Sequence, residues 1–414
     1  NSVPPYMTGS FWAWYGEAAK TAVGFFWKSG WAFVLGYSIS AMIQSFVPKA
    51  RLTTYMGDPD AQSIGLSTLF GAASSSCSFA ALAAARSLVA KGAHFVSAVA
   101  FMFASTNLVI ELGILILIFL GPQYLAAEIV GGLVLIALSS LLIRWTYPSD
   151  WIEAAREKAE AEAPEMEDDF DWKERIRSRK GWHMVGKSFV DEWTMVWEEI
   201  LIGFTVAGFV AVLVPQAFWE ALFLTNFQGQ FPAWVIAIEN AIVAPFVAAA
   251  TFIGSMGNIP LATVLASNGV LFAGIMGFIY SDLMVPPLVA TNAKYYGWRV
   301  ALYIAGIMFV SIVATALLLD GAFALVGWTP EGAREIAGLT QFKIDYTFWM
   351  NLVSVAVVGG QIYLRRQHRR MHEEGGHDHN HGSDGLSLKR LVVYVFIAVL
   401  IGGLVAFALT GGTA

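Results

Sequence analysis

The hydrophobic and polar positions of the chain fall into long blocks, with apolar runs separated by clusters of charge. A helix that crosses a bilayer needs about 20 mostly apolar residues. Runs of that kind occur eight times between the charged positions and predict eight membrane spans, with no soluble domain evident. The predicted spans lie near 30–48, 95–119, 123–144, 198–214, 271–291, 300–319, 348–364 and 391–410.

Two further apolar stretches, 61–91 and 231–269, do not fit a simple span. Small and polar residues interrupt each of them, at Ser74–Ser78 in the first and at Gly254–Pro260 in the second. Non-helical backbone at membrane depth persists only inside protein or beside water. We therefore predict that each stretch forms a re-entrant helical hairpin.

The two stretches also resemble each other. Ser78–Gly92 aligns without gaps on Ser255–Gly269, and Leu35-Gly36 upstream matches Ile202-Gly203. This pattern predicts two halves, each with one span, one hairpin and two further spans. Because three full crossings is an odd number, the halves should be inverted, and that arrangement places most Lys and Arg residues on the cytoplasmic side. The expected fold class is an all-α polytopic membrane protein with two inverted repeats, each containing a re-entrant helical hairpin, and about eight spans plus two hairpins.

Charged segments divide the chain into the regions that this fold requires. A run rich in acidic and then basic residues separates the halves, and a second polar run separates the last two spans. Trp and Tyr favour the headgroup layer, so the aromatic start predicts an interfacial helix. The expected regions are an interfacial N-terminal helix at 1–29, the first membrane repeat at 30–147, a charged cytoplasmic linker at 148–195, the second membrane repeat at 196–320, and two additional C-terminal spans at 321–414 with a His-rich linker at 365–390.

Composition agrees with a membrane protein and excludes several other classes. Of the 414 residues, 57% are hydrophobic and 14% are charged, well below the roughly 25% charged residues of a soluble domain. The net charge of −6 offers no basic surface for nucleic acid. One cysteine, Cys77, excludes an intramolecular disulfide and any metal site built from several cysteines.

The interrupted centres of the hairpins are candidate binding sites. Broken helices expose backbone N–H and C=O groups, and helix N-termini carry partial positive charge. Two tips that meet at the midplane would bind an ion or a small polar solute, and Cys77 and Met256 would add soft sulfur ligands. The alternative is that the small residues serve only close helix packing. The candidate substrate-binding residues are Ser75, Ser76, Cys77, Ser78, Asn107, Ser255, Met256, Gly257 and Asn258.

Ionisable residues inside membrane segments are costly and usually functional. Glu111 and Asp282 lie in the spans that follow the hairpins, and Glu239 lies within the second hairpin. We predict proton-coupling roles for these three carboxyl groups, the alternative being structural carboxylates hydrogen-bonded across helices. Glu128 is interpreted as a structural residue near the membrane boundary, and Glu198-Glu199 as acids at a helix start.

Five of the seven histidines lie in the linker at 365–390. Imidazoles close together in a polar segment can bind a transition metal weakly. His377, His379 and His381 are the candidate ligands, and a polar linker without this function is the alternative. No other cofactor is required.

The repeated hairpins resemble the predicted-permease family that includes the organoarsenical efflux permeases. The resemblance lies in Ser76-Cys77-Ser78 followed by Gly92, and in Gly254–Leu261 followed by Gly269, and it extends over roughly 30–320. It implies a multi-pass inner-membrane permease that exports metalloid or metal species. The chain departs from the family pattern, because its first motif has one cysteine and its second has Gly254 and Met256 in place of cysteines.

Together these features predict a secondary-active permease of the bacterial inner (plasma) membrane that exports a small metalloid or thiophilic solute with proton coupling. The alternatives are a transporter of divalent or soft metal ions, and a channel or non-transporting membrane subunit of a larger complex. An enzyme is not expected, since the sequence has no nucleophile–base pair, Walker loop or dinucleotide motif. The expected partners are the lipid bilayer and a small solute or ion, without nucleic acid, and a homo-oligomer is left open.

Overall fold

The computed structural model describes residues 10–46, 56–74, 78–161, 172–251, 253–330, 335–373 and 388–410. Within these ranges the regular structure is helical, and one isolated bridge joins Gln228 and Phe231. The all-α fold predicted from the apolar runs is therefore confirmed. The Ser75–Cys77 tip of the first hairpin and the candidate ligands His377, His379 and His381 lie outside the described residues.

The helices occur in a similar order in the two parts of the chain. The first part contains α1 (Phe11–Phe46), α2 (Ala61–Ser74), α3 (Ser78–Ala90), α4 (Phe95–Asn107), α5 (Ile110–Phe119) and α6 (Pro122–Thr146). Between the parts lie α7 (Ser149–Ala161) and α8 (Trp172–Arg177). The second part contains α9 (Arg179–Leu213), α10 (Gln216–Leu222), η4 (Thr225–Phe227), α11 (Ala233–Thr251), α12 (Ser255–Ser267), α13 (Phe272–Ile279), η5 (Asp282–Met284), α14 (Pro286–Tyr296) and α15 (Trp298–Val326). The chain continues through α16 (Ile336–Leu339), α17 (Tyr346–Glu373) and α18 (Leu388–Thr410).

Two glycines that the sequence alignment pairs occupy equivalent turns. Gly92 follows α3 with φ of 96°, and Gly269 follows α12 with φ of 86°. Glycine adopts positive φ without the steric cost that a Cβ atom brings. Helices α3 and α12 therefore end in the same kind of turn before the next buried helix begins.

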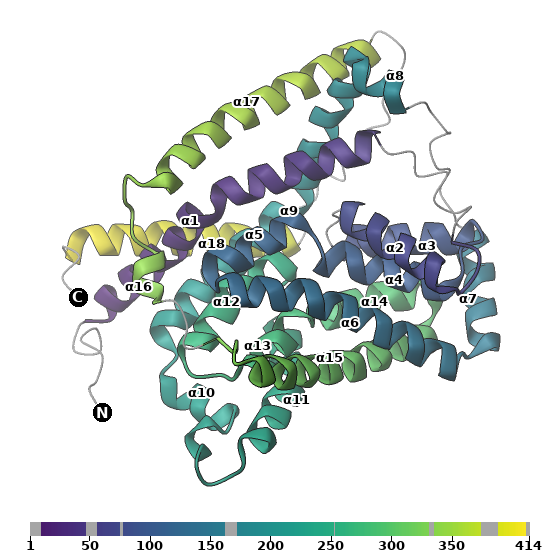
Figure 1. The fold of residues 1–414 in the computed structure, drawn as a ribbon. Helices are drawn as coiled ribbons and strands as arrows, with labels where there is room; N and C mark the ends of the chain where they lie inside the picture. The colour runs from purple at the N-terminus through teal and green to yellow at the C-terminus, as the bar shows by residue number, and fades with distance from the viewer. Residues whose placement is uncertain are drawn as a thin grey trace.

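The long helices α1 and α9 pack against each other in opposite directions. Near the start of α1, Ala22 contacts Gly208 near the end of α9. At the other end, the rings of Phe46 and Trp182 lie 5.4 Å apart, and Trp182 is in the first turn of α9. In Figure 1, α17 lies above α1, and both α17 and α18 contact α1. The two longest helices thus form an antiparallel pair.

A second antiparallel pair joins α6 and α15. A Cβ atom built on Gly131 would lie 2.5 Å from the side chain of Leu319, and the hydroxyl groups of Thr146 and Tyr303 are 2.8 Å apart. The short helices pack reciprocally across the two parts, because α3 contacts α14 and α12 contacts α5. Each short helix after a break therefore meets a helix of the other part, α3 meeting α14 as α12 meets α5.

The centre of the molecule is formed by α4 and α13. Every residue of both helices is buried. A helix that is apolar on all sides is stable only when other elements surround it completely. In contrast, only 11% of the apolar segment of α17 and 22% of that of α18 are buried, so these two helices lie at the periphery (Figure 1).

Six helices in the described ranges are long and apolar enough to cross a membrane, and the pair α4–α5 would make a seventh. Two spans that the sequence predicts as continuous are broken. The 95–119 segment bends by 41° between α4 and α5, and the 271–291 segment divides into α13, η5 and α14. Pro286 and Pro287 at the start of α14 explain the second break, because proline cannot donate to the helix ladder.

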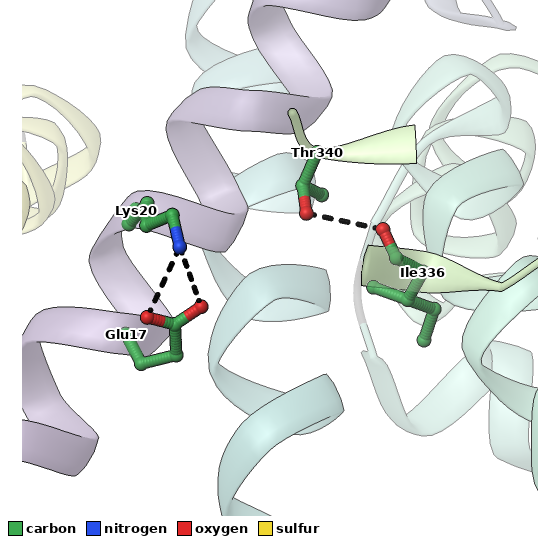
Figure 2. A network of polar contacts seen from close by, with 4 residues as sticks. All are labelled: Glu17, Lys20, Ile336 and Thr340. Atoms are coloured by element: carbon green, nitrogen blue, oxygen red, sulfur yellow. Dashed lines mark hydrogen bonds and ion pairs between the residues drawn. The ribbon is translucent and has the colours of Figure 1, made fainter. Parts of the chain in front are cut away.

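The sequence also predicts a boundary near residue 29, and the structure has none, because α1 is continuous from Phe11 to Phe46. Figure 2 shows how this helix accommodates charge: Lys20 Nζ donates to both carboxylate oxygens of Glu17, at 3.0 and 3.3 Å. Beside it, Thr340 donates to Ile336 O in α16 at 3.0 Å. Local pairing lets the helix carry both ionic side chains without a break.

Candidate functional site

One narrow pocket lies where the two parts of the chain meet. The volume that the centre of a water molecule can occupy in this pocket is about 10 Å³, so the pocket can hold roughly one water molecule. Five helices contribute side chains to it. The lining residues are Tyr37 of α1, Ser78 of α3, Glu111 of α5, Val196, Glu199 and Ile200 of α9, and Gly254, Ser255, Met256 and Gly257 at the start of α12.

Two helix N-termini open into this pocket. Helix α3 begins at Ser78, and α12 begins at Ser255 after the N-cap residue Gly254. Gly254 makes no side-chain cap hydrogen bond, so the first N–H groups of α12 depend on other groups at the pocket for partners. The partial positive charge of both helix ends is directed to the same small volume.

The second N-terminus is fixed by close packing against α9. A Cβ atom built on Gly203 would lie 2.6 Å from Gly257 Cα and 2.8 Å from the side chain of Ile253. Only a glycine at this position lets the two backbones approach so closely. The Gly203 position, which the sequence alignment pairs with Gly36, therefore sets where Ser255 and Met256 lie.

Helix α5 is held against α1 in a similar way. A Cβ atom built on Gly36 would lie 3.0 Å from Glu111 Cα. Glu111 is 2% exposed and stands in the first turn of α5, directly after the break between α4 and α5. Its carboxyl group therefore enters the pocket from a helix N-terminus, where a negative charge is favoured.

Glu199 provides the second carboxyl group of the pocket. A Cβ atom built on Gly254 would lie 2.7 Å from Glu199 Oε2, so the carboxylate stands beside the N-cap of α12. The sequence interpretation of Glu199 as an acid at a helix start is wrong, because α9 begins at Arg179 and places it five turns into the helix. A long amphipathic run preceding residue 198 would have been the signal for this position.

Asp282 connects the second part of the chain to α3. It is fully buried in η5, at the break between α13 and α14, and Ser78 Oγ donates to its Oδ2 at 3.3 Å. Its Oδ1 has no hydrogen-bond partner among the described residues. Asp282 therefore approaches the pocket through Ser78, which itself lines the pocket.

The end of α2 is attached to α1 close to the same region. Gln44 Nε2 donates to Ser74 O at 3.1 Å, and Ser40 Oγ lies 3.4 Å from the same carbonyl. Both side chains also donate to the carboxylate of Glu192 on α9. These contacts fix Ser74, the last residue of α2, at the α1–α9 interface.

Three other residues predicted from the sequence are not among the residues that line the pocket. Asn258 is fully buried one residue beyond the pocket-lining Gly257, and neither of its side-chain amide atoms has a partner in the described structure. Asn107 is buried at the end of α4, where its Nδ2 donates to Phe103 O at 3.1 Å. Glu239 accepts from Asn240 on α11 at 2.8 Å and is not part of the pocket lining.

A second group of buried polar residues escaped the sequence interpretation. Glu128, expected near the membrane boundary, is 2% exposed within α6, and Tyr280 beside it is fully buried. Tyr280 Oη donates to Ala127 O at 3.0 Å and lies 3.2 Å from Glu128 O. No local signal identifies this pair, because the two residues are more than 150 positions apart.

Within the ranges that the structure describes, no group of three or more His, Cys, Asp or Glu side chains converges closely enough to hold a metal ion. The pocket instead combines hydroxyl, thioether and carboxyl groups with helix N-termini, and no Lys or Arg occurs among its lining residues. Such a lining can hold a small uncharged or cationic solute and disfavours an anion.

Comparison with known proteins identifies a family of membrane permeases. The family described as "Predicted permease" matches residues 15–321, which include α1 through most of α15. A curated protein of Mycobacterium tuberculosis named "Putative permease Rv2963" is 35% identical over 329 residues, covering 76% of this chain and 79% of its own length. No solved structure matches the chain. The pocket between two sets of membrane helices and the family match over most of the sequence agree, and this chain belongs to the predicted permease family.

Proposed function

We propose that the protein is a secondary-active permease that carries a small metalloid or thiophilic solute through the pocket between α3, α5, α9 and α12. The observation that carries the proposal is the meeting of two helix N-termini and two carboxyl groups in one buried volume. Broken helices at the interface of two repeats are a recurring design of secondary transporters.

The proposed inverted arrangement of the halves is supported by helix direction. Helices α1 and α9, which correspond in the two halves, are antiparallel, and so are α6 and α15. Reciprocal contacts of α3 with α14 and of α12 with α5 fit a two-fold axis that passes between the hairpins. A rocking motion of one half against the other would then open the pocket alternately to each side.

The chemistry of the lining indicates the class of solute. Met256 supplies a soft sulfur, Ser78 and Ser255 supply hydroxyl groups, and the two acids favour a neutral or positively charged species. An uncharged trivalent metalloid hydroxide meets these conditions. We propose export as the direction, with the linker at 148–195 in the cytoplasm.

Proton coupling is assigned to Asp282 and Glu111. Each stands at a break in a membrane helix, where a carboxyl group can change partners without disrupting a continuous helix ladder. Protonation of Asp282 would change its acceptance of the Ser78 hydroxyl and hence the position of the α3 N-terminus. Solute occupancy and proton occupancy would then be linked through one serine.

Purified protein in liposomes tests this function. Uptake of arsenite, a monomethyl arsenical, Zn²⁺ and Co²⁺ is measured with and without an imposed pH gradient. We expect a metalloid to accumulate against its gradient, and Asp282→Asn to abolish that accumulation while leaving solute exchange at equal pH. Glu220→Gln, at the exposed side chain that pairs with Gln216, is the matched control and should behave as wild type. The proposal is refuted if no solute moves, or if Asp282→Asn transports normally.

A further inference from the structure

Two buried carboxyl groups, one on α6 and one at the α13–α14 break, lie near each other outside the pocket lining. Glu128 is 2% exposed and Asp282 is fully buried. The Tyr280 hydroxyl, two residues before Asp282, bonds to the α6 backbone at Ala127 and Glu128. Asp282 follows Tyr280 by two residues, so these hydrogen bonds hold the η5 turn that carries Asp282 against the α6 turn that carries Glu128.

Both groups lack the hydrogen bonds that buried carboxylates ordinarily make. Neither Oε1 nor Oε2 of Glu128 has a partner in the described part of the chain, and the same is true of Asp282 Oδ1. A buried polar atom of this kind requires a partner that protein atoms do not supply, such as a proton or water. Three such oxygen atoms occur on these two residues.

Basic side chains do not balance the pair. The helices that pack on α6 are α4, α5, α13 and α15, those that pack on η5 are α11, α14 and α15, and α3 reaches Asp282 through Ser78. By sequence these elements contain four basic residues, Arg86, Arg144, Lys294 and Arg299. Arg144 is about 24 Å along α6 from Glu128, Arg86 is about 12 Å along α3 from Ser78, and Lys294 is in the last turn of α14. Two neighbouring buried carboxylates without a close counter-charge are not both ionised, so at least one of them holds a proton. The other titratable groups on these elements are Glu111 of α5, Tyr124 of α6, Glu239 of α11, Tyr295 and Tyr296 of α14, Tyr303 and Asp320 of α15, and Tyr280 between α13 and η5.

We infer that Glu128 and Asp282 share one exchangeable proton and that Glu128 is the residue through which this proton reaches Asp282. The inference rests on the proposed function for its transport consequence. Glu128 lies about 9 Å along α6 from Pro122, the first residue of that helix. In the proposed topology this end faces the outside, so a proton moving inward meets Glu128, then Asp282, then Ser78 at the pocket.

The position of Tyr280 explains why the pair persists. A Cβ atom on Gly131 would collide with the Tyr280 ring, so a glycine is needed one turn beyond Ala127 for the tyrosine to reach the α6 backbone. This anchoring holds η5 against α6 and keeps Asp282 on the side of Glu128. The carboxyl pair therefore results from packing between the halves and not from any local motif.

Infrared difference spectroscopy of the purified protein tests the shared proton directly. The C=O stretch of a protonated carboxylic acid is recorded from pH 5 to pH 9 in H₂O and D₂O. We expect one titrating band in the wild type, changed or lost in both Glu128→Gln and Asp282→Asn, because the two residues hold the same proton. Asp320→Asn, at a half-buried carboxyl of α15, is the matched control and should leave the band unchanged.

Folding and transport measurements accompany the spectra. Glu128→Gln removes a group without hydrogen-bond partners, so its elution from size exclusion and its helical circular dichroism should match wild type. Accumulation driven by a pH gradient should fall at least about tenfold, with exchange retained, and Glu128→Asp should restore part of it. The inference is overturned if Glu128→Gln leaves the band intact while Asp282→Asn removes it, or if the wild type has no such band. Absence of flux with an intact, doubly sensitive band would instead refute the proposed function alone.

Discussion

Adding one methyl group at Gly203, where α9 contacts α12, should lower the stability of the protein by an amount that the structure allows us to estimate. In Gly203→Ala the new Cβ atom would lie 2.6 Å from Gly257 Cα and 2.8 Å from the side chain of Ile253. Carbon atoms pack favourably at about 3.5–4.0 Å. Because the nearer atom belongs to the backbone, it cannot rotate away, and the helices must separate by roughly 1 Å.

The energetic cost follows from this displacement. Overpacking of a buried contact costs about 1–3 kcal/mol, and replacing glycine by alanine in a helix returns up to about 1 kcal/mol. We therefore expect Gly203→Ala to lose about 1–2 kcal/mol of unfolding free energy. Gly306→Ala on α15 is the matched control, since no atom lies within 4 Å of its built Cβ, and it should gain up to about 1 kcal/mol.

The Gly203→Ala substitution should change both the unfolding free energy and the transport rate. Unfolding by sodium dodecyl sulfate in mixed micelles, followed by circular dichroism, measures the free energy difference. Flux in liposomes should fall by about tenfold or more in Gly203→Ala, because a displacement of about 1 Å at α12 moves Ser255 and Met256 away from the opposite wall. If the two alanine variants are equally stable and equally active, the close α9–α12 contact does not determine the pocket.

Two further substitutions test the surrounding structure. Tyr280→Phe removes the hydroxyl bonded to Ala127 O and Glu128 O and should cost about 1 kcal/mol in the same unfolding assay, whereas an unchanged value would show that this contact contributes nothing to helix packing. His94, in the turn before α4, caps that helix in its neutral form, and burial together with Arg156 lowers its pKa. Its stabilisation is complete above the unfolded pKa of about 6.5 and is lost as pH falls through the lower folded value. Thermal unfolding between pH 7 and pH 5 should therefore be less pH-dependent in His94→Asn, which retains a neutral cap, and a pH profile identical to that of wild type would contradict this role.

The apolar pattern and its interruptions were sufficient to predict much of the architecture. The helical fold and the helix starts at Ser78 and Ser255 agree with the local pattern, and the aligned Gly92 and Gly269 occupy equivalent turns. These features depend on contacts within one segment, such as helix propensity, apolar length and the positive φ of glycine.

Other features could not be inferred locally. The bend between α4 and α5 and the division of 271–291 arise where helices from both halves cross, so an apolar run alone indicates one continuous span. Glu199 and Glu128 each seemed explained by a nearby helix start or membrane boundary. The start of α9 at Arg179 removes Glu199 from a helix start, and packing by neighbouring helices buries Glu128 although it lies within the first two turns of α6.

Length and hydropathy act along the chain, so the sequence was sufficient to predict an all-helical membrane protein with two interrupted apolar stretches, and its motifs were sufficient to suggest the permease family. The folded arrangement was needed to show that Ser78 meets Asp282, 204 positions away, and that Ser255 and Glu199 line the same pocket as Ser78. Such pairs depend on the direction and depth at which distant helices cross. Close approach at glycines such as Gly203 sets that depth, and it exists only in the folded molecule.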